Sequence, residues 1–101
     1  MISERVDILI VYDIDTTSAK GRRRWRSICK LCEAYGQRVQ FSVFECRVTE
    51  AQLEEVEAKA VATIDEETDS LRIYVLRGGR DASLRAHGID RYHDFDQPLV
   101  Y

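Results

Sequence analysis

Asp13 is the residue of this sequence whose type and position best suit catalysis. It follows Tyr12 directly, at the carboxyl end of the apolar run Val6–Tyr12. A carboxylate beside phosphate oxygens suits a hard divalent cation that keeps water ligands, above all Mg²⁺. Asp15, two residues further on, is a second and less well placed candidate. An aspartate at such a strand end also often caps the loop into the next helix, so a metal ligand and a loop cap remain alternatives for Asp13.

A basic cluster follows Asp13 at short distance. Its members are Lys20, Arg22, Arg23, Arg24 and Arg26. Guanidinium groups near a helix N-terminus hold phosphates by charge and by their planar fork of donors. They do not read bases, so we expect nucleic-acid binding to be weakly sequence-specific and strongly salt-dependent. A solvated basic helix face would have the same composition, and this alternative applies most to Arg23 and Lys30.

The remaining candidate motifs indicate no further chemistry. Cys29 and Cys32 match C-x-x-C, but they fall on the apolar side of a helical pattern and no second pair completes a zinc site. We therefore expect them to pack in the core. His87 and His93 have no Cys, Ser or carboxylate partner at a recognisable spacing. Neither a Gly-rich phosphate loop nor a nucleophile elbow is present, so acyl transfer has no support.

Charge is unevenly distributed along the 101 residues. The total of 15 Lys and Arg against 18 Asp and Glu gives −3, which by itself argues against a nucleic-acid binder. Residues 1–47, however, hold nine basic and six acidic side chains, whereas residues 48–101 hold six and twelve. Twelve of the basic residues are Arg, which suits phosphate. A local phosphate-binding surface and two solvated helix faces of opposite sign both fit this polarity.

Targeting signals are missing from the sequence. Its N-terminus has neither a basic leader nor a cleavage site, and the longest apolar run, Ile8–Tyr12, is far shorter than the roughly 18 residues of a membrane span. Three cysteines cannot all pair within one chain, which fits a reducing compartment. We expect a cytoplasmic protein that does not associate with a membrane.

The elements that must position these residues follow from hydrophobic periodicity. A strand buried on both faces is predicted over Val6–Tyr12, and a helix begins near Thr16–Ser18 and ends at Gly36 in the manner of a C′ glycine. Residues 38–48 are extended, as one long strand or as two. A capping box of Thr49 and Gln52 opens a second helix with the apolar stripe Leu53, Val56, Ala60 and Ile64 and an acidic outer face. A last strand covers Leu71–Leu76, before a Gly78–Gly79 turn.

Together these elements predict one α+β domain. If the middle region splits in two, the order is βαββαβ, the ferredoxin-like sandwich of two helices on one face of an antiparallel sheet. We place this core at residues 1–78 and a C-terminal tail at 79–101, whose apolar end Leu99–Tyr101 either frays or adds an edge strand elsewhere. The uncovered face of the sheet predicts a two-fold homodimer. Two Asp13 carboxylates near the axis would then repel each other unless a cation lies between them.

Four segments resemble the CRISPR-associated Cas2 family across roughly residues 6–78. They are Val11-Tyr12-Asp13-Ile14, the basic helix ending in Tyr35-Gly36, Arg38-Val39-Gln40-Phe41-Ser42-Val43-Phe44-Glu45, and Asp69-Ser70-Leu71-Arg72-Ile73-Tyr74. The resemblance implies a ferredoxin-like homodimer, with the middle region folded into two short strands that bend near Phe41–Ser42. It also implies a magnesium-dependent endonuclease on RNA or double-stranded DNA, with one Mg²⁺ held across the dimer interface by Asp13 of each chain.

Further site residues are implied by the same resemblance. Counting back from Tyr35-Gly36 aligns Arg24 and Arg26 with the family's paired helix arginines, and Arg38 and Phe44 match its strand positions. We expect nucleic acid to be bound by Arg22, Arg24, Arg26 and Arg38, with Tyr12 and Phe44 as structural residues near the site. The stretch between Asp13 and the helix is longer than in many relatives, and Trp25 stands where a polar residue is often found.

Two functions remain open from the sequence. The first is a homodimeric nuclease in spacer acquisition, with the CRISPR integrase subunit as a partner. The second is a non-catalytic adaptor that binds duplex DNA and that integrase, with the acidic second half and Leu99–Tyr101 as docking surfaces. The resemblance also implies that the C-terminal segment adds a strand to the partner's sheet. A small-ligand regulatory domain is a third possibility, which the run of arginines argues against.

Overall fold

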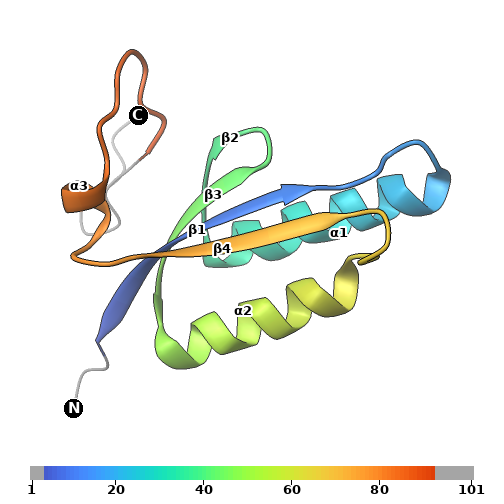
Figure 1. Cartoon of the computed structure of the whole chain (residues 1–101), viewed down its shortest axis with the longest axis horizontal. Coiled ribbons are helices and arrows are strands. Elements are labelled where there is room, and N and C mark those ends of the chain that lie inside the picture. Colours follow the sequence, from blue (N-terminus) through green and yellow to red (C-terminus); the bar gives the residue numbers. More distant parts are fainter. Residues whose placement is uncertain (1–3, 93–101) are drawn as a thin grey trace.

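The structure is a computed structural model that describes residues 4–92. It has the predicted α+β, ferredoxin-like architecture: a four-stranded antiparallel sheet in the order β2-β3-β1-β4, with α1 and α2 on one face (Figure 1). The elements in chain order are β1 (Arg5–Asp13), α1 (Ala19–Tyr35), β2 (Gly36–Gln40), β3 (Val43–Thr49), α2 (Glu50–Thr63), β4 (Ser70–Leu76) and α3 (Arg80–Ser83). No helix within residues 4–92 is long and apolar enough to cross a membrane.

Strand β1 lies at the centre of the sheet, between β3 and β4. Its residue Ile10 pairs with Phe44 on one side and with Ile73 on the other. Side chains alternate between the two faces of a strand, so Ile8, Ile10 and Tyr12 are buried beneath the helices, whereas Leu9 and Val11 on the other face are only half-buried. The sequence predicted that this strand is buried on both faces. Within a single chain, only the face of β1 beneath the helices is fully buried.

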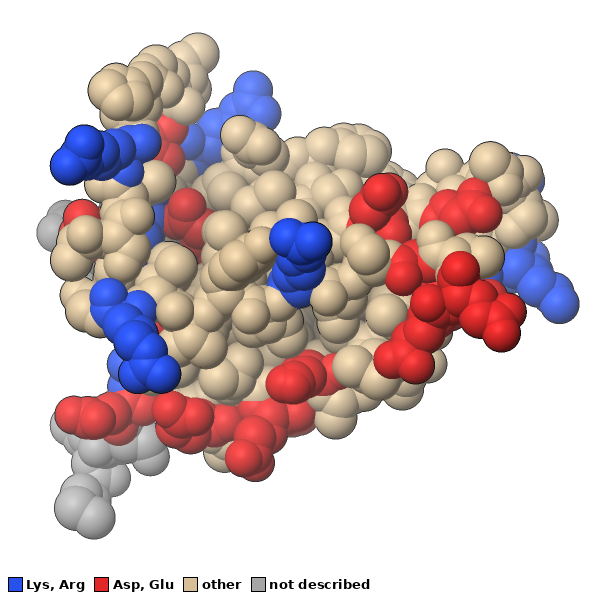
Figure 2. Space-filling view, in the orientation of Figure 1, with Lys and Arg blue, Asp and Glu red and all other residues tan. Residues whose placement is uncertain are grey.

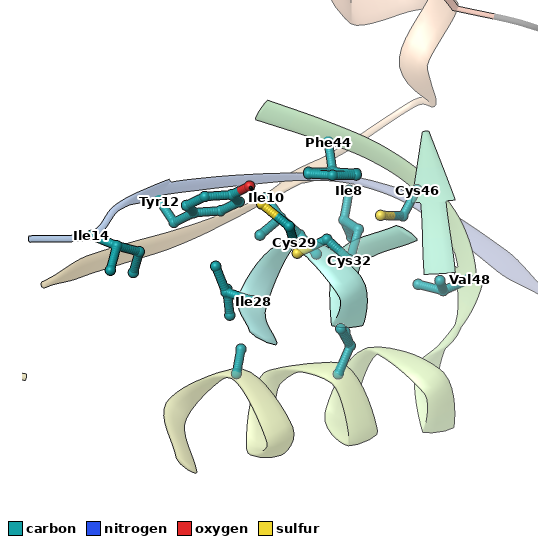
Figure 3. Packing of buried hydrophobic residues seen from close by; sticks show 12 residues of the cluster. Ile8, Ile10, Tyr12, Ile14, Ile28, Cys29, Cys32, Phe44, Cys46 and Val48 are labelled. Atoms are coloured by element: carbon teal, nitrogen blue, oxygen red, sulfur yellow. Dashed lines mark hydrogen bonds between the residues drawn. The ribbon is translucent and has the colours of Figure 1, made fainter. Parts of the chain in front are cut away.

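The hydrophobic core lies between the sheet and the two helices (Figure 3). Fully burying one Val, Ile or Phe side chain stabilises a fold by about 1.5–3 kcal/mol relative to leaving that side chain exposed to water. The core draws on the predicted apolar faces of β1, α1 and α2. Its members are Ile8, Ile10, Tyr12, Ile14, Ile28, Cys29, Cys32, Phe44, Cys46, Val48, Val56 and Ala60.

Both helices begin where the sequence predicts. The Ser18 hydroxyl accepts a hydrogen bond from the Gly21 backbone N–H at 3.0 Å and caps α1. Thr49 and Gln52 form the reciprocal capping box at the start of α2, at 3.2 and 2.9 Å. These bonds satisfy backbone donors that the first helical turn leaves without partners.

Gly36 ends α1 as expected, but for a different reason. Its backbone is extended, with φ −161° and ψ −160°, and it is the first residue of β2 rather than a left-handed C′ residue. A Cβ at this position would overlap the sulfur of Cys46 and the carbonyl oxygen of Glu45. Glycine is therefore required by the close approach of β2 to β3, which the local sequence alone does not reveal.

The middle region consists of two strands. β2 and β3 form a hairpin whose turn is Phe41–Ser42, and the register shifts between Arg38 and Gln40. The bend lies where the family resemblance implied it. Because the Tyr12 N–H donates to the carbonyl oxygen of Ser42 at 3.2 Å, this turn is held beside the end of β1.

The chain after β4 contains a short helix that the sequence did not predict. Gly78 and Gly79 have φ values of 80° and 91°, which glycine adopts without strain, and they turn the chain into α3. Arg80 is 8% exposed and is paired with Glu45 of β3. The start of the expected tail is thus tied to the core, and the domain boundary at residue 78 stays a prediction. His93 and Leu99–Tyr101 lie outside the described residues.

Candidate metal and nucleic-acid site

Asp13 is the last residue of β1 and lies at the end of the sheet. Strand alternation puts it on the face opposite the helices, with Leu9 and Val11, and its side chain is exposed. Within residues 4–92 its carboxylate has no hydrogen-bond or ion-pair partner. The carboxylate is therefore available to an external ligand, whereas its neighbour Tyr12 is fixed in the core.

Asp15 has a structural role instead. Its carboxylate oxygen Oδ1 accepts hydrogen bonds from the backbone N–H of Thr17 at 2.9 Å and from the Thr17 hydroxyl at 2.6 Å. These bonds hold the pKa of the Asp15 carboxyl below its usual value. A carboxylate engaged in this way shapes the loop before α1, so Asp13 is the better metal candidate.

A buried carboxylate that the sequence analysis did not single out anchors the loop that follows Asp13. The Asp69 side chain is fully buried and accepts from the backbone N–H groups of Asp15 and Asp65, each at 2.9 Å, and from the Arg24 Nε at 2.8 Å. Burial alone would raise the pKa of Asp69. The bonds from Arg24, Asp65, Asp15 and Thr68 outweigh it and hold that pKa well below its usual range.

The predicted arginines fall into two groups. Arg22 and Arg26 are exposed on α1, and the Arg22 guanidinium donates to the Thr16 carbonyl at 3.3 Å. Arg24 lies between them in sequence but is bound to Asp69, so its guanidinium positions the loop after Asp13. A phosphate contact by Arg24 stays a prediction, and Arg22 and Arg26 are the better candidates for one.

Arg38 lies on β2, at the edge of the sheet. Its guanidinium carbon is 5.3 Å from the centre of the Phe44 ring, and its Nη2 is 3.7 Å from the Glu33 carboxylate. Phe44 in turn stacks on Tyr12 at 6.2 Å between ring centres. The expected structural roles of Tyr12 and Phe44 thus have a physical basis, since the two rings link Arg38 to the end of β1.

The cysteines belong to the core. The Cys29 sulfur lies 2.9 Å from the Tyr12 hydroxyl (Figure 3), and burial raises the pKa of both Cys32 and Cys46 to about 12. Thiols with such pKa values stay protonated at neutral pH and are poor nucleophiles and metal ligands. Cys29 and Cys32 are both buried in the core, so the C-x-x-C pair is packing, as predicted.

The side chains that a single chain offers to a metal are few. Among the described residues no group of three His, Cys, Asp or Glu side chains is arranged to hold an ion. The hard oxygen donors of Asp13 nevertheless suit Mg²⁺, which commonly binds one or two carboxylates and keeps water and phosphate oxygens as its other ligands. The Asp13 carboxylate thus fits a magnesium ion that takes its other ligands from water and phosphate.

A second network of charges lies at the opposite end of β1. Asp7 accepts from the Arg47 Nε at 2.9 Å and from the Arg80 backbone N–H at 2.8 Å, and the Arg80 guanidinium lies 3.5 Å from the centre of the Tyr92 ring. Together with the Arg80–Glu45 ion pair, these contacts hold the segment after β4 against the sheet. They serve the fold rather than the site.

Acidic side chains gather on two parts of the surface. Figure 2 shows them gathered along α2 and at the right-hand end of the view. The exposed acidic face of α2 consists of Glu50, Glu54, Glu55 and Glu57, as predicted. A polyanion would be repelled from the acidic face of α2, so we expect nucleic acid to approach from α1.

Comparisons of the chain with a family model and with known sequences all indicate the same family. The family model described as CRISPR associated protein Cas2 matches residues 6–83. The chain is 46% identical over 93 residues to the CRISPR-associated endoribonuclease Cas2 1 of Moorella thermoacetica, covering 92% of this chain and 97% of that protein. It is 43% identical over 94 residues to the CRISPR-associated endonuclease Cas2 of Halalkalibacterium halodurans, covering 93% and 98%.

Solved structures agree with this result. Crystalline Cas2 of Streptococcus pyogenes at pH 6.5 superposes with a TM-score of 0.71 at 43% identity, over 81% of this chain and 99% of that one. A hypothetical protein of Thermus thermophilus superposes with a TM-score of 0.72 at 31% identity, over 87% and 96%. The likeness thus extends over nearly the whole length of both solved chains.

Proposed function

The chain belongs to the CRISPR-associated Cas2 family, and we propose that it is an endonuclease whose cleavage of RNA or double-stranded DNA depends on Mg²⁺. It would work as a cytoplasmic homodimer in spacer acquisition, together with the CRISPR integrase subunit. The observation that carries the proposal is the carboxylate of Asp13, which is exposed at the end of β1 and has no partner among the described residues. Nuclease activity is further supported by relatives named endoribonuclease and endonuclease.

Each residue of the site would have a distinct task. Asp13 of each chain would hold the ion, and Arg22 and Arg26 would hold backbone phosphates by charge-assisted hydrogen bonds. Arg24 and Asp69 would keep the loop after Asp13 in place. Mg²⁺, when bound, would stabilise the negative charge that develops on the phosphate. The side chains would thus share three tasks, which are holding the ion, binding phosphates and fixing the loop.

The experiment that tests the proposed activity is cleavage by the purified chain with its metal controlled. Labelled single-stranded RNA and duplex DNA are incubated with the protein in Mg²⁺, in excess EDTA, and in EDTA followed by Mg²⁺ in excess. We expect cleavage in Mg²⁺, its loss in EDTA and its recovery when Mg²⁺ is restored. Cleavage that persists in EDTA would contradict the proposal.

The sheet face opposite the helices supports the homodimer. It carries half-buried Leu9 and Val11 beside Tyr74, which is 44% exposed. Burying such a face in a two-fold interface would remove apolar area from water and bring the two Asp13 residues toward the axis. Light scattering at micromolar concentration should give the mass of two chains. The mass of one chain would contradict the prediction.

Phosphate binding by α1 predicts a salt-dependent effect. Arg22→Ala and Arg26→Ala should weaken binding to all sequences alike, and the slope of log affinity against log salt should fall by about 1 for each phosphate that is no longer neutralised. Arg77→Ala removes the same charge from an exposed position after β4 and serves as the control. Equal slopes for the Arg22 and Arg77 variants, measured by fluorescence anisotropy across a salt series, would show that α1 does not bind the backbone.

The sparse set of catalytic groups favours a second candidate function. No three-residue ligand cluster exists among the described residues, and Asp15 and Asp69 are engaged in structural hydrogen bonds. A DNA-binding adaptor of the integrase complex needs no more than the dimer and the arginines. Asp13→Ala assayed for spacer integration separates the two functions, because an adaptor keeps integration without cleavage whereas an obligatory nuclease loses both.

A further inference from the structure

An exposed arginine of β4 lies on the same face of the sheet as Asp13. The pairing of β1 with β4 sets Ser70 opposite Asp13 and Arg72 opposite Val11, and residues directly opposite each other in an antiparallel pair share a face. Arg72 is therefore the diagonal neighbour of Asp13, and a long side chain spans the roughly 7–8 Å between such neighbours. Figure 1 shows β4 running alongside β1.

The charge of Arg72 is not neutralised within the described part of the chain. Its Nη1 donates a hydrogen bond to the Tyr74 hydroxyl at 3.0 Å, and no carboxylate of residues 4–92 forms an ion pair with it. A guanidinium has five N–H donors, so the bond to Tyr74 fixes the group and leaves the other donors for a ligand.

The other carboxylates on this face of the sheet already have arginine partners. Asp7 is bound by Arg47 at 2.9 Å, and Glu45 is bound by the arginine that begins α3. Asp13 and Arg72 are thus two neighbouring charges of opposite sign, neither of which is paired among residues 4–92. A phosphate that carries a divalent cation complements both, because the cation suits the carboxylate and the phosphate oxygens suit the guanidinium.

These two side chains lie at a corner of the sheet. β4 is an edge strand, and the pair of Asp13 and Ser70 is the last one in its ladder with β1. A second chain that covers Leu9 and Val11 in the middle of the face leaves this corner at the rim of the interface. The arginines of α1 belong to a helix that packs on the other face of the sheet, so they do not take this position.

We propose that Arg72 is a catalytic residue, whose guanidinium binds the oxygens of the phosphate that is cleaved at Asp13. The inference rests on the proposed function, because it needs a phosphate held at that carboxylate. As an attacking oxygen bonds to phosphorus and the bond to the leaving oxygen breaks, negative charge spreads over the phosphate oxygens, and a fixed guanidinium stabilises it. Arg72 stays protonated throughout, so it supplies charge and hydrogen bonds but exchanges no proton.

Cleavage rates compare Arg72 with a matched arginine. Arg72→Gln removes the charge, and its kcat should fall by about 100- to 1,000-fold while KM changes less, since the contact strengthens in the transition state. Arg72→Lys keeps the charge without the planar fork, and its kcat should lie between those of Arg72→Gln and the parent. Arg5→Gln removes the same charge from an exposed position at the other end of this sheet face and should cleave like the parent.

Binding without metal gives a readout that is independent of cleavage. The Asp13→Asn chain, which has no carboxylate to repel the phosphate, is titrated in EDTA with labelled single-stranded RNA and with labelled duplex DNA across a salt series. Adding Arg72→Gln should lower the slope of log affinity against log salt by about 1 for at least one of the two nucleic acids, the loss of one neutralised phosphate. Adding Arg5→Gln should leave both slopes unchanged.

Three results would overturn this role of Arg72. They are equal kcat values for Arg72→Gln and Arg5→Gln, equal salt slopes for these two variants with both nucleic acids, and the mass of one chain for Arg72→Gln in light scattering where the parent has the mass of two. The last result would show that Arg72 holds the dimer together instead. If the parent does not cleave, the proposed function fails, whereas the salt slopes, measured without metal, still decide whether Arg72 binds phosphate.

Discussion

Asp13→Ala is expected to lower the rate of magnesium-dependent cleavage by more than about 100-fold, the effect of removing a group that stabilises charge at the reacting phosphate. The side chain has no structural partner among the described residues and is exposed at the end of β1. Its removal should therefore leave the fold unchanged, and the melting temperature should stay close to that of the parent. Initial rates on labelled RNA and duplex DNA at saturating Mg²⁺ measure the effect.

Two further variants sharpen this test. Asp13→Asn keeps the shape of the side chain but removes its charge, and it should lose activity like the alanine variant because Mg²⁺ prefers a carboxylate. Glu54→Ala removes an exposed carboxylate from the acidic face of α2 and should cleave like the parent. If Asp13→Ala cleaves within about threefold of Glu54→Ala, Asp13 does not hold the metal.

The second large effect is expected for stability. Asp69→Ala should lower the free energy of unfolding by about 3 kcal/mol, because the change leaves Arg24 and the N–H groups of Asp15 and Asp65 without their shared acceptor. For a domain of this size that corresponds to a fall in melting temperature of roughly 15 °C. Denaturant unfolding of parent and variant at equal protein concentration measures the change, since a dimer's stability depends on concentration.

The pH dependence of this effect has a definite sign. The pKa of Asp69 is lowered in the folded chain, so its charged form stabilises the fold above the ordinary aspartate pKa, near pH 4, and this contribution is lost as the pH falls below that value. The difference between the parent and Asp69→Asn should therefore be constant from pH 6 to 8 and shrink on acidification below about pH 4. A difference that grows on acidification would show that Asp69 is not charged in the folded chain.

Local patterns predicted much of the fold. The Ser18 and Thr49 caps, the apolar stripes of both helices and the strand at Val6–Tyr12 depend on residues close in sequence, and each is present in the structure. The burial of that strand on both faces, which the sequence also predicted, is complete on one face only. The division of the middle region into β2 and β3 was implied only by the family resemblance. No Gly, Pro or Asn marks the Phe41–Ser42 turn, so composition leaves the two possibilities equal.

The parts that the sequence did not predict depend on contacts between distant residues. In the sequence Asp69 is only the first residue of a segment that resembles the family. Its partner Arg24 is 45 residues away, and Arg80 is buried against Glu45, 35 residues away. Periodicity does not separate a buried ion pair from two exposed charges. The position of Asp69 directly before β4 was the available signal, since β4 pairs with the end of β1 through Ser70 and Asp13.

The Arg24–Asp69 ion pair also shows that the arginines of α1 have different roles. Its arginines looked equivalent in sequence, yet Arg24 positions the loop behind Asp13 while Arg22 and Arg26 remain exposed. Arg24→Ala should therefore reduce stability, whereas Arg22→Ala should reduce only salt-sensitive binding. One helix thus serves both the fold and the proposed phosphate contacts, because alternate residues point in different directions.

A magnesium site shared by two Asp13 side chains is tested most directly by counting the ions that the protein binds. Titration calorimetry of the purified chain in the presence of a non-cleavable oligonucleotide gives the number of Mg²⁺ ions per chain. We predict one ion for every two chains of the parent and no binding at this site by Asp13→Ala. One ion for every chain, or an unchanged stoichiometry in the Asp13 variant, would contradict a site that two chains build together.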